Sequence, residues 1–192
     1  QRGFITVSCT VRNPDHLESD LFGHVKDAFP GARAARVGRI EQADGGTICI
    51  EEITEAPLRT QEKLLDFIRT GKFKRFGGHR NVSVDVRVAA LTSRDLRKET
   101  EAGRFLPELT EALSARVLEI PPLRERKEDI PLLASYFIEH LRLELDDRSA
   151  KGLTDEALEK MIYYDWPGNI RELKNVLERA LFTSGKEILE PE

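Results

Sequence analysis

The sequence predicts an α/β fold, in which a parallel β-sheet with flanking helices is followed by a subdomain built only of helices. Apolar β-type segments alternate with helical segments as far as about Pro121, and only helical patterns follow. The segment GGTICIEE, residues 45–52, joins a short apolar strand to the adjacent acids Glu51 and Glu52. Paired acids at the carboxyl end of a buried strand are typical of the ligand-binding edge of an open parallel sheet.

Composition favours a folded, water-soluble protein. The chain has 192 residues, of which 40% are hydrophobic and 33% are charged, so it can bury a core and keep a charged surface. Its formal net charge of −4 gives no global attraction to nucleic acid or to anionic membranes. No apolar run reaches the roughly 20 residues of a membrane span, and no signal peptide is visible, so we expect a cytoplasmic protein without a membrane partner. Cys9 and Cys49 lie in β-like runs and are expected to be buried free thiols.

The first half of the chain contains two expected strands, two helical segments and one loop. Alternation and β-branching predict strands over residues 5–9 and 47–50. Residues 14–23 are expected to form a short helix, and residues 36–43 a helical turn that Gly45 and Gly46 stop. Pro30 and Gly31 break the pattern between these helices, so residues 27–35 are expected to form an exposed loop.

The next segments continue the alternation. Residues 57–70 are expected to form a helix, with Leu58, Leu64, Leu65 and Ile68 on its inward stripe and Gly71 at its end. A hairpin or loop over residues 72–81 leads into an interior strand over residues 84–91. The remaining expected elements before Pro121 are helices over residues 94–103 and 109–113 and a strand over residues 117–120.

Only helices are expected after the proline pair Pro121-Pro122. Residues 128–145 form an amphipathic pattern with Pro131 in the first turn, and residues 153–164 form a second. Asn169 and Glu172 stand as a capping-box-like pair at the start of a third helix. We therefore expect an α/β core over residues 1–122 and a helical subdomain over residues 123–192.

The adjacent acids Glu51 and Glu52 suggest a site for nucleotide hydrolysis. At this edge in nucleotide hydrolases, one acid holds Mg²⁺ and a second polarises the attacking water. Thr92 and Ser93 follow the strand over residues 84–91, so they are expected to meet Glu51 and Glu52 at the same edge. The alternative is a strand that runs into an acidic, solvated turn.

Six motifs occur in a characteristic order: LESDLFGH, DAFPGA, ADGGTICIEEI, VRVAALTSRDL, IPPLRERKEDIPLL and WPGNIRELKNVLERA. Together they resemble the central AAA+ domain of bacterial enhancer-binding proteins, the activators of sigma-54 RNA polymerase. The resemblance covers essentially the whole chain. It implies a nucleotide-binding α/β domain with a helical lid, ATP or ADP with Mg²⁺ as cofactor, self-association into a dimer or ring, and contact with an RNA polymerase sigma factor. It also implies DNA binding through a further domain outside this chain.

The nucleotide motifs depart from the family pattern. The sequence contains no GxxxxGK[ST] phosphate loop, which either lies upstream of this chain or is lacking. The family's Asp-Glu pair is Glu51-Glu52 here, so the acid on the Mg²⁺ side is displaced by a methylene while Glu52 keeps the position of the water-polarising acid. The first-strand asparagine that restrains this glutamate is Ser8, and the sensor Thr-Asn is Thr92-Ser93.

The arginine positions depart as well. The two arginines that reach into a neighbouring subunit's site in the family align with Leu106 and Ala112, while Arg104 and Arg116 are out of register. Such arginines are worth roughly 10³–10⁵ in rate. The lid arginine of the family is kept as Arg171.

The polymerase-contacting loop, GAFTGA in the family, is DAFPGA here. It consists of Asp27, Ala28, Phe29, Pro30, Gly31 and Ala32. Asp27 replaces a glycine and restricts the backbone, and Pro30 replaces the threonine and removes a hydroxyl and an N–H. Phe29 is retained, either as an exposed contact residue or as a side chain that packs down.

Three interpretations follow. The first is an AAA+ domain of a transcriptional regulator with weak or absent ATP hydrolysis, acting through oligomerisation or regulatory contacts. The second is part of an active sigma-54 activator ATPase. The third is a DNA-binding module, because residues 153–164 and 169–183 mimic a helix-turn-helix, although the last helix carries mixed charge.

Overall fold

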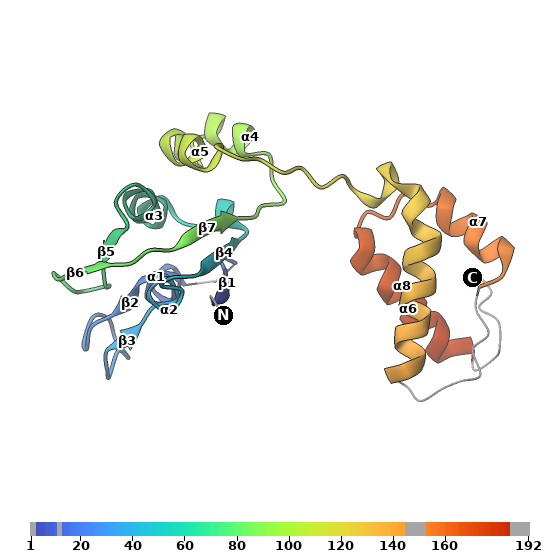
Figure 1. The fold of residues 1–192 in the computed structure, drawn as a ribbon, viewed down its shortest axis with the longest axis horizontal. Coiled ribbons are helices and arrows are strands. Elements are labelled where there is room, and N and C mark those ends of the chain that lie inside the picture. The colour runs from blue at the N-terminus through green and yellow to red at the C-terminus, as the bar shows by residue number, and fades with distance from the viewer. Residues whose placement is uncertain (1–2, 11–12, 145–152, 185–192) are drawn as a thin grey trace. The chain divides into compact units, whose positions relative to one another are not determined.

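The computed structural model describes residues 3–10, 13–144 and 153–184. The chain divides into two compact units, Gln1–Val117 and Leu118–Glu192 (Figure 1). The first contains the sheet and the second contains helices, as the sequence predicts.

The first unit is built on a three-stranded parallel sheet with the order β1-β4-β7. Its strands are β1 (Phe4–Ser8), β4 (Thr47–Glu51) and β7 (Arg87–Ala90). In the register, Ser8 lies opposite Glu51 and Ile50 opposite Ala90. The expected strands over residues 5–9 and 47–50 are confirmed, and β4 is the central strand.

The expected strand over residues 84–91 is divided. Its first part continues from β6 (Asn81–Ser83), which forms an antiparallel hairpin with β5 (Lys72–Lys74), and only β7 belongs to the sheet. The Asp85 N–H donates to Asp44 Oδ1 (2.8 Å), and the Asp85 carbonyl accepts from Gly45 N–H (2.8 Å). These two bonds fix residues 84–86, which connect the β5–β6 hairpin to the parallel sheet and belong to neither.

Helices and two short strands complete the first unit. They are α1 (Pro14–Phe22), β2 (Gly23–His24), β3 (Arg36–Val37), α2 (Arg39–Gln42), the 3₁₀ turn η1 (Ile53–Glu55), α3 (Leu58–Thr70), α4 (Leu96–Glu101) and α5 (Pro107–Leu113). Asn13 Oδ1 caps α1 by accepting from Asp15 N–H (2.9 Å), and Gly71, at φ 66°, ends α3 as expected.

A continuous apolar core holds these elements together. Its fully buried side chains include Phe22, Ile48, Ile50, Leu64 and Leu109. Leu58 was expected on the inward stripe of α3 but is 45% exposed. It lies six residues before Leu64, about 120° away around the helix, so the two cannot share a face.

The expected strand over residues 117–120 is wrong. Val117, Leu118 and Ile120 are 63%, 94% and 78% exposed, and no strand is formed there. A strand needs a neighbouring ladder to pair its backbone groups, and no described strand pairs with this segment. Apolar composition alone therefore did not make a strand.

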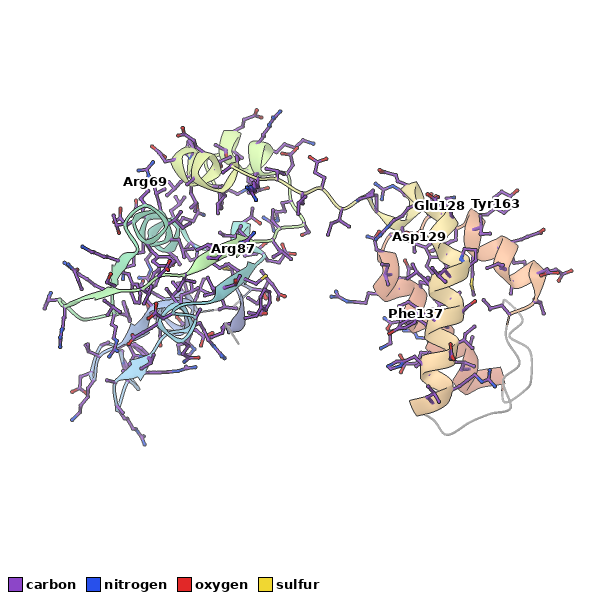
Figure 2. The ribbon with its side chains drawn as sticks, viewed as in Figure 1. Arg69, Arg87, Glu128, Asp129, Phe137 and Tyr163 are labelled. Atoms are coloured by element: carbon purple, nitrogen blue, oxygen red, sulfur yellow. The ribbon has the colours of Figure 1, made fainter. Side chains whose placement is uncertain are left out.

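The second unit is a small helical subdomain with its own core. It contains the 3₁₀ turns η2 (Leu123–Glu125) and η3 (Lys127–Asp129), followed by α6 (Ile130–Glu144), α7 (Asp155–Tyr163) and α8 (Asn169–Ser184). α6 packs against α7 and α8. The core is formed by Leu123, Ile130, Ala134, Ile138, Trp166, Leu173 and Leu177, and Phe137 on α6 packs against it (Figure 2).

The capping box at the start of α8 is partly wrong. Glu172 Oε2 does accept an N–H near the helix start, from Gly168 (2.8 Å). Asn169 instead adopts φ 53°, and its Oδ1 accepts from Leu123 N–H (2.8 Å), 46 residues away. The tight Trp166-Pro167-Gly168 turn directs this amide to η2, so Asn169 fastens the first turn of the subdomain to α8.

Within the described residues, none of the helices combines the length and apolar character needed to cross a membrane.

Candidate active site

The expected convergence of Glu51, Glu52 and Thr92 is confirmed, because β4 and β7 are parallel neighbours. The Leu91 N–H donates to the Ile50 carbonyl (2.8 Å), and the Ile53 N–H donates to the Leu91 carbonyl (3.0 Å). These two bonds bring the chain after β4 beside the chain after β7. The acids and the hydroxyl residues therefore occupy one carboxyl edge of the sheet.

Glu52 is held by Ser93. Both the backbone N–H and the hydroxyl of Ser93 donate to Glu52 Oε2, at 3.2 and 3.0 Å. Glu52 also has a left-handed backbone, at φ 49°, which costs a non-glycine residue about 1–2 kcal/mol. A carboxylate fixed in this way has one oxygen engaged and one left for another donor.

Ser8 does not take part in this restraint. Its hydroxyl lies 2.8 Å from Thr10 Oγ1 and accepts from Thr10 N–H. In this structure the partner of Glu52 therefore comes from the chain after β7 and not from β1.

Thr92 is fixed by two hydrogen bonds. Its hydroxyl lies 2.9 Å from Thr54 Oγ1 and accepts from Arg94 N–H (3.0 Å). The pair of hydroxyls joins η1 to the end of β7, which stiffens the loop that carries Glu52.

Glu51 is exposed at the end of β4, and no ion pair to it is found in the described part of the chain. Its carboxylate fits one oxygen ligand of Mg²⁺, an ion that usually keeps waters and takes further oxygens from substrate phosphates. No cluster of three or more acids, histidines or cysteines suited to a metal occurs among the described residues. Glu51 would contribute one ligand to the ion, and the bound ion would supply charge neutralisation.

Cys9 lies behind the acids. Burial, together with the nearby charges of Glu52 and Glu55, raises the pKa of the Cys9 thiol to about 12. Its backbone N–H donates to the Glu51 carbonyl (2.9 Å). Cys9 and Cys49 are both buried and free, as expected, so neither is a nucleophile here.

The sequence did not reveal a charged network beside this edge. Arg94 pairs with Glu55 and also approaches Glu99 (3.6 Å), and Glu99 accepts two hydrogen bonds from Arg104, at 2.7 and 2.9 Å. The hydrogen bond from Arg104 lowers the pKa of Glu99, against the opposing effect of burial, and the charges of Arg104 and Arg94 lower it further. The closely spaced acids and arginines were the available signal.

Leu106 and Ala112, which the resemblance aligns with the family's two arginines, carry no charge. Leu106 packs against the core of the first unit, and its N–H donates to Gln61 Oε1 (2.9 Å). Arg104, out of register with these positions, is already engaged with Glu99.

The loop over residues 27–32 is closed by its own backbone. The Asp27 N–H donates to the Ala32 carbonyl (2.8 Å), and Asp27 adopts φ 62°. Asp27, Pro30 and Gly31 are exposed, whereas Ala28 is half-buried and Ala32 is buried.

Phe29 packs down instead of projecting into solvent. Its ring lies 5.0 Å from the His24 ring and 5.8 Å from the Phe76 ring, so it is half-buried between β2 and the β5–β6 hairpin. His24 is itself buried, and its Nδ1 lies 2.7 Å from Ser19 Oγ. Phe76 was not recognised from the sequence, although an aromatic residue directly before Gly77-Gly78 is a visible signal.

Arg171 lies in the other unit, exposed in the first turn of α8. It makes no ion pair within the described residues, so its guanidinium is free to bind an external group.

Comparison with known families identifies the class. Residues 1–119 match the family described as the Sigma-54 interaction domain, and residues 124–192 match the AAA+ ATPase lid domain. The chain therefore belongs to the sigma-54 interaction domain family, with an AAA+ lid. The family of the resemblance and the predicted AAA+ fold are confirmed, and the lid match covers the helices that mimic a helix-turn-helix.

Particular relatives are longer than this chain. It is 44% identical over 193 residues to the transcriptional regulatory protein ZraR of Escherichia coli (strain K12), covering 100% of this chain and 44% of the relative. It is 47% identical over 176 residues to the regulatory protein LuxO of Vibrio cholerae, covering 92% of this chain and 33% of the relative. The chain thus spans less than half of either protein.

Among solved structures, NtrX from Brucella abortus superimposes with a TM-score of 0.88 at 30% identity, covering 98% of this chain and 43% of that protein. NtrX in complex with ATP superimposes with a TM-score of 0.84 at 31% identity, over 96% of this chain and 41% of that protein.

Proposed function

We propose that this chain is the AAA+ domain of a bacterial sigma-54-type transcriptional regulator in which ATP hydrolysis is weak or absent. On this proposal the domain acts through self-association and regulatory contacts. The proposal rests on Leu106 and Ala112, which the resemblance aligns with the family's intersubunit arginines and which carry no charge; Leu106 is half-buried and packs against the core. Without these charges the transition state of phosphoryl transfer loses its main stabilisation from a neighbour.

The remaining site supports nucleotide recognition better than turnover. Glu51 would contact Mg²⁺, Thr92 and Ser93 would sense the phosphates, and Arg171 would bind them from the lid. Glu52 retains a position suited to polarising water, but one oxygen is taken by Ser93. Mg²⁺ tolerates altered ligand geometry poorly, and Glu51 is longer than the family's aspartate.

Hydrolysis is tested by steady-state phosphate release with Mg-ATP over a range of protein concentrations, with Glu52→Gln as the matched inactive control. We expect the wild-type rate to equal that of Glu52→Gln. Turnover that Glu52→Gln abolishes would contradict the proposal and favour an active activator ATPase. That second candidate is kept because Glu52, Thr92 and Ser93 converge, and because NtrX is known in complex with ATP.

The loop over residues 27–32 determines the expected sigma-factor contact. Asp27 adds charge, Pro30 stiffens the loop, and Phe29 is half-buried, so we expect no productive engagement of sigma-54. A pull-down against sigma-54 holoenzyme and the major holoenzyme, repeated with Asp27→Gly/Pro30→Thr, tests this. Capture of sigma-54 by the unmodified protein with a transition-state nucleotide analogue would overturn it.

Self-association is tested separately by sedimentation velocity, because it does not depend on hydrolysis. We expect the sedimentation coefficient to rise with protein concentration. A constant monomer value across the range would remove oligomerisation from the proposal.

A further inference from the structure

The β5–β6 hairpin is strongly cationic in an acidic protein. Residues 72–83 contain Lys72, Lys74, Arg75 and Arg80 and no carboxylate, although the formal net charge of the chain is −4. The global charge argues against nucleic-acid binding, but binding depends on local charge. The net charge of the whole chain therefore does not describe this segment, which is locally cationic.

The hairpin has two different faces. Lys72 lies opposite Ser83 and Lys74 opposite Asn81, so these four side chains share one face of the ribbon. All four are exposed. Between them, Phe73 lies opposite Val82 on the other face and is buried, with its ring 5.6 Å from Phe22 and 5.9 Å from Phe67. We call the exposed side, formed by Lys72, Lys74, Asn81 and Ser83, the cationic ribbon face.

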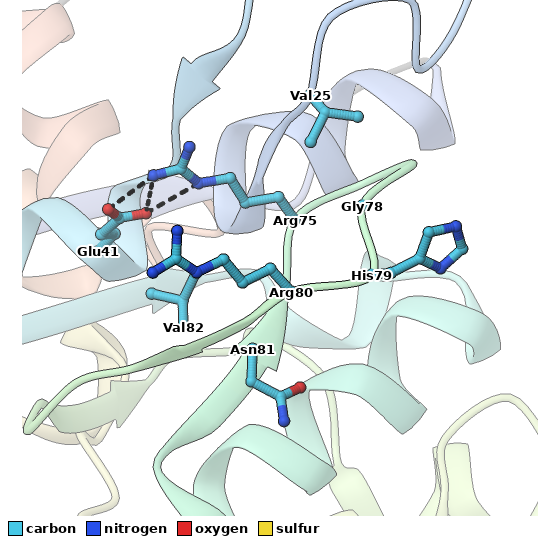
Figure 3. A pocket seen from close by; sticks show the side chains of 8 residues that line it. All are labelled: Val25, Glu41, Arg75, Gly78, His79, Arg80, Asn81 and Val82. Atoms are coloured by element: carbon cyan, nitrogen blue, oxygen red, sulfur yellow. Dashed lines mark hydrogen bonds and ion pairs between the residues drawn. The ribbon is translucent and has the colours of Figure 1, made fainter.

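The ribbon is fixed to the rest of the unit. Arg75 makes a bidentate ion pair with Glu41 on α2, with hydrogen bonds of 2.8, 2.9 and 3.2 Å (Figure 3). The Phe76 and Val25 backbones are also hydrogen bonded, at 3.1 Å. Anchoring on one side reduces the ordering cost of binding on the other.

Three cations of the hairpin are available to a partner. Lys72, Lys74 and Arg80 form no ion pair within the part of the chain that the structure describes. Arg80 lies beside Arg75 at a cavity of about 370 Å³, and no interaction joins it to Glu41 (Figure 3). Glu41 is committed to Arg75, so the hairpin presents uncompensated positive charge.

We propose that the cationic ribbon face binds the phosphate backbone of duplex DNA. Lysine, serine and asparagine side chains are common donors to phosphate oxygens. The face has no aromatic or aliphatic side chain, whereas protein interfaces are depleted in lysine and depend on buried aromatic or arginine anchors. The contact carries no base-specific readout, so it is sequence-independent and weakens as salt rises. It needs neither nucleotide nor Glu52 and is separate from the proposed function.

The experiment measures anisotropy of a labelled duplex of mixed sequence titrated with the 192-residue protein at several salt concentrations. We expect micromolar binding at low salt. In Lys72→Gln/Lys74→Gln, affinity falls roughly tenfold or more, and the slope of log K against log salt decreases by about 2, since each phosphate contact contributes about 0.9. Lys72→Arg/Lys74→Arg keeps the binding.

Arg97→Gln/Lys98→Gln on α4 is the matched control, because it removes the same charge from exposed residues of the same unit. We expect it to bind like the wild type. Three results would overturn the proposal: no binding by the wild type, equal losses in both double variants, or a labelled polyglutamate peptide that binds through Lys72 and Lys74 while duplex DNA does not. The last result would assign the face to an acidic protein segment.

Discussion

At the scale of single residues, two buried threonines illustrate how hydrogen bonding decides the sign of a substitution. Thr60 is fully buried, and within the described part of the chain its hydroxyl has no hydrogen-bond partner. Thr54 is also buried, but its hydroxyl pairs with that of Thr92 at 2.9 Å. An unpaired buried hydroxyl is a cost to the folded state, whereas a paired one is a modest gain.

Valine has nearly the shape of threonine and therefore tests this difference. We expect Thr60→Val to leave the free energy of unfolding unchanged or raise it by about 1 kcal/mol, and Thr54→Val to lower it by about 1–2 kcal/mol. Urea unfolding followed by circular dichroism measures both, with the slope m unchanged if only stability changes. Equal destabilisation by the two variants would show that the hydroxyl of Thr60 finds a partner.

Glu99 gives a pH-dependent prediction. Its pKa is lowered from the ordinary value of 4.5, mainly by the hydrogen bond from Arg104. A carboxyl whose folded-state pKa is depressed stabilises the fold above its unfolded pKa, and this contribution is lost as pH falls through the folded pKa. We therefore expect the wild type to be more stable than Glu99→Gln at neutral pH, with the difference shrinking below about pH 4.5.

Thermal unfolding from neutral to acidic pH measures this difference. Glu111→Gln is the control, because Glu111 is exposed on α5 and forms no ion pair within the described ranges. A gap between wild type and Glu99→Gln that stays constant down to acidic pH would refute the assignment.

At the scale of elements, Gln61 joins α3 to the segment before α5. Its Nε2 donates to the carbonyls of Ala56 (2.7 Å) and Arg104 (3.0 Å), and its Oε1 accepts from Leu106 N–H (2.9 Å). The residue is fully buried, so its side-chain amide is shielded from water. This amide fixes the position of Leu106.

We expect Gln61→Leu to lower the free energy of unfolding by about 2–4 kcal/mol, because it leaves a buried N–H and two carbonyls without partners. Chemical denaturation measures the loss, and faster hydrogen exchange at the Leu106 amide locates it. Glu62→Leu, at the adjacent exposed position, should have little effect. Similar losses in both variants would assign the effect to α3 in general.

Local patterns predicted most of the elements, but not the absence of a strand over residues 117–120 and not the long-range polar contacts. Periodicity and Gly71 were sufficient for α3, and the apolar runs were sufficient for β4 and for its neighbourhood with β7. The choice of Leu123 as the partner of Asn169 depends on a contact across 46 residues, which no local pattern encodes. The same holds for the site: the meeting of Glu52 with Ser93 followed from sheet topology, whereas the packing of Phe29 did not.

At the scale of the whole molecule, two separate cores explain why the chain forms two units. The first core surrounds the sheet, and the second is closed by Trp166, whose Nε1 donates to the Met161 carbonyl (2.7 Å). Residues 114–121, between α5 and η2, are all exposed. The apolar residues in this segment therefore contribute to neither core.

Exposure of an irregular segment predicts where a protease cuts. Arg116 lies in this segment and is followed by Val117, which is 63% exposed. We expect brief trypsin digestion to yield a fragment ending at Arg116 among the first products, and mass spectrometry identifies it. Arg116→Gln, digested in parallel, should lose that fragment and keep the other early products. If trypsin cuts sites within helices but leaves the bond after Arg116 intact, the segment is covered in solution. Self-association through the exposed Leu118 and Ile120 would cover it in this way.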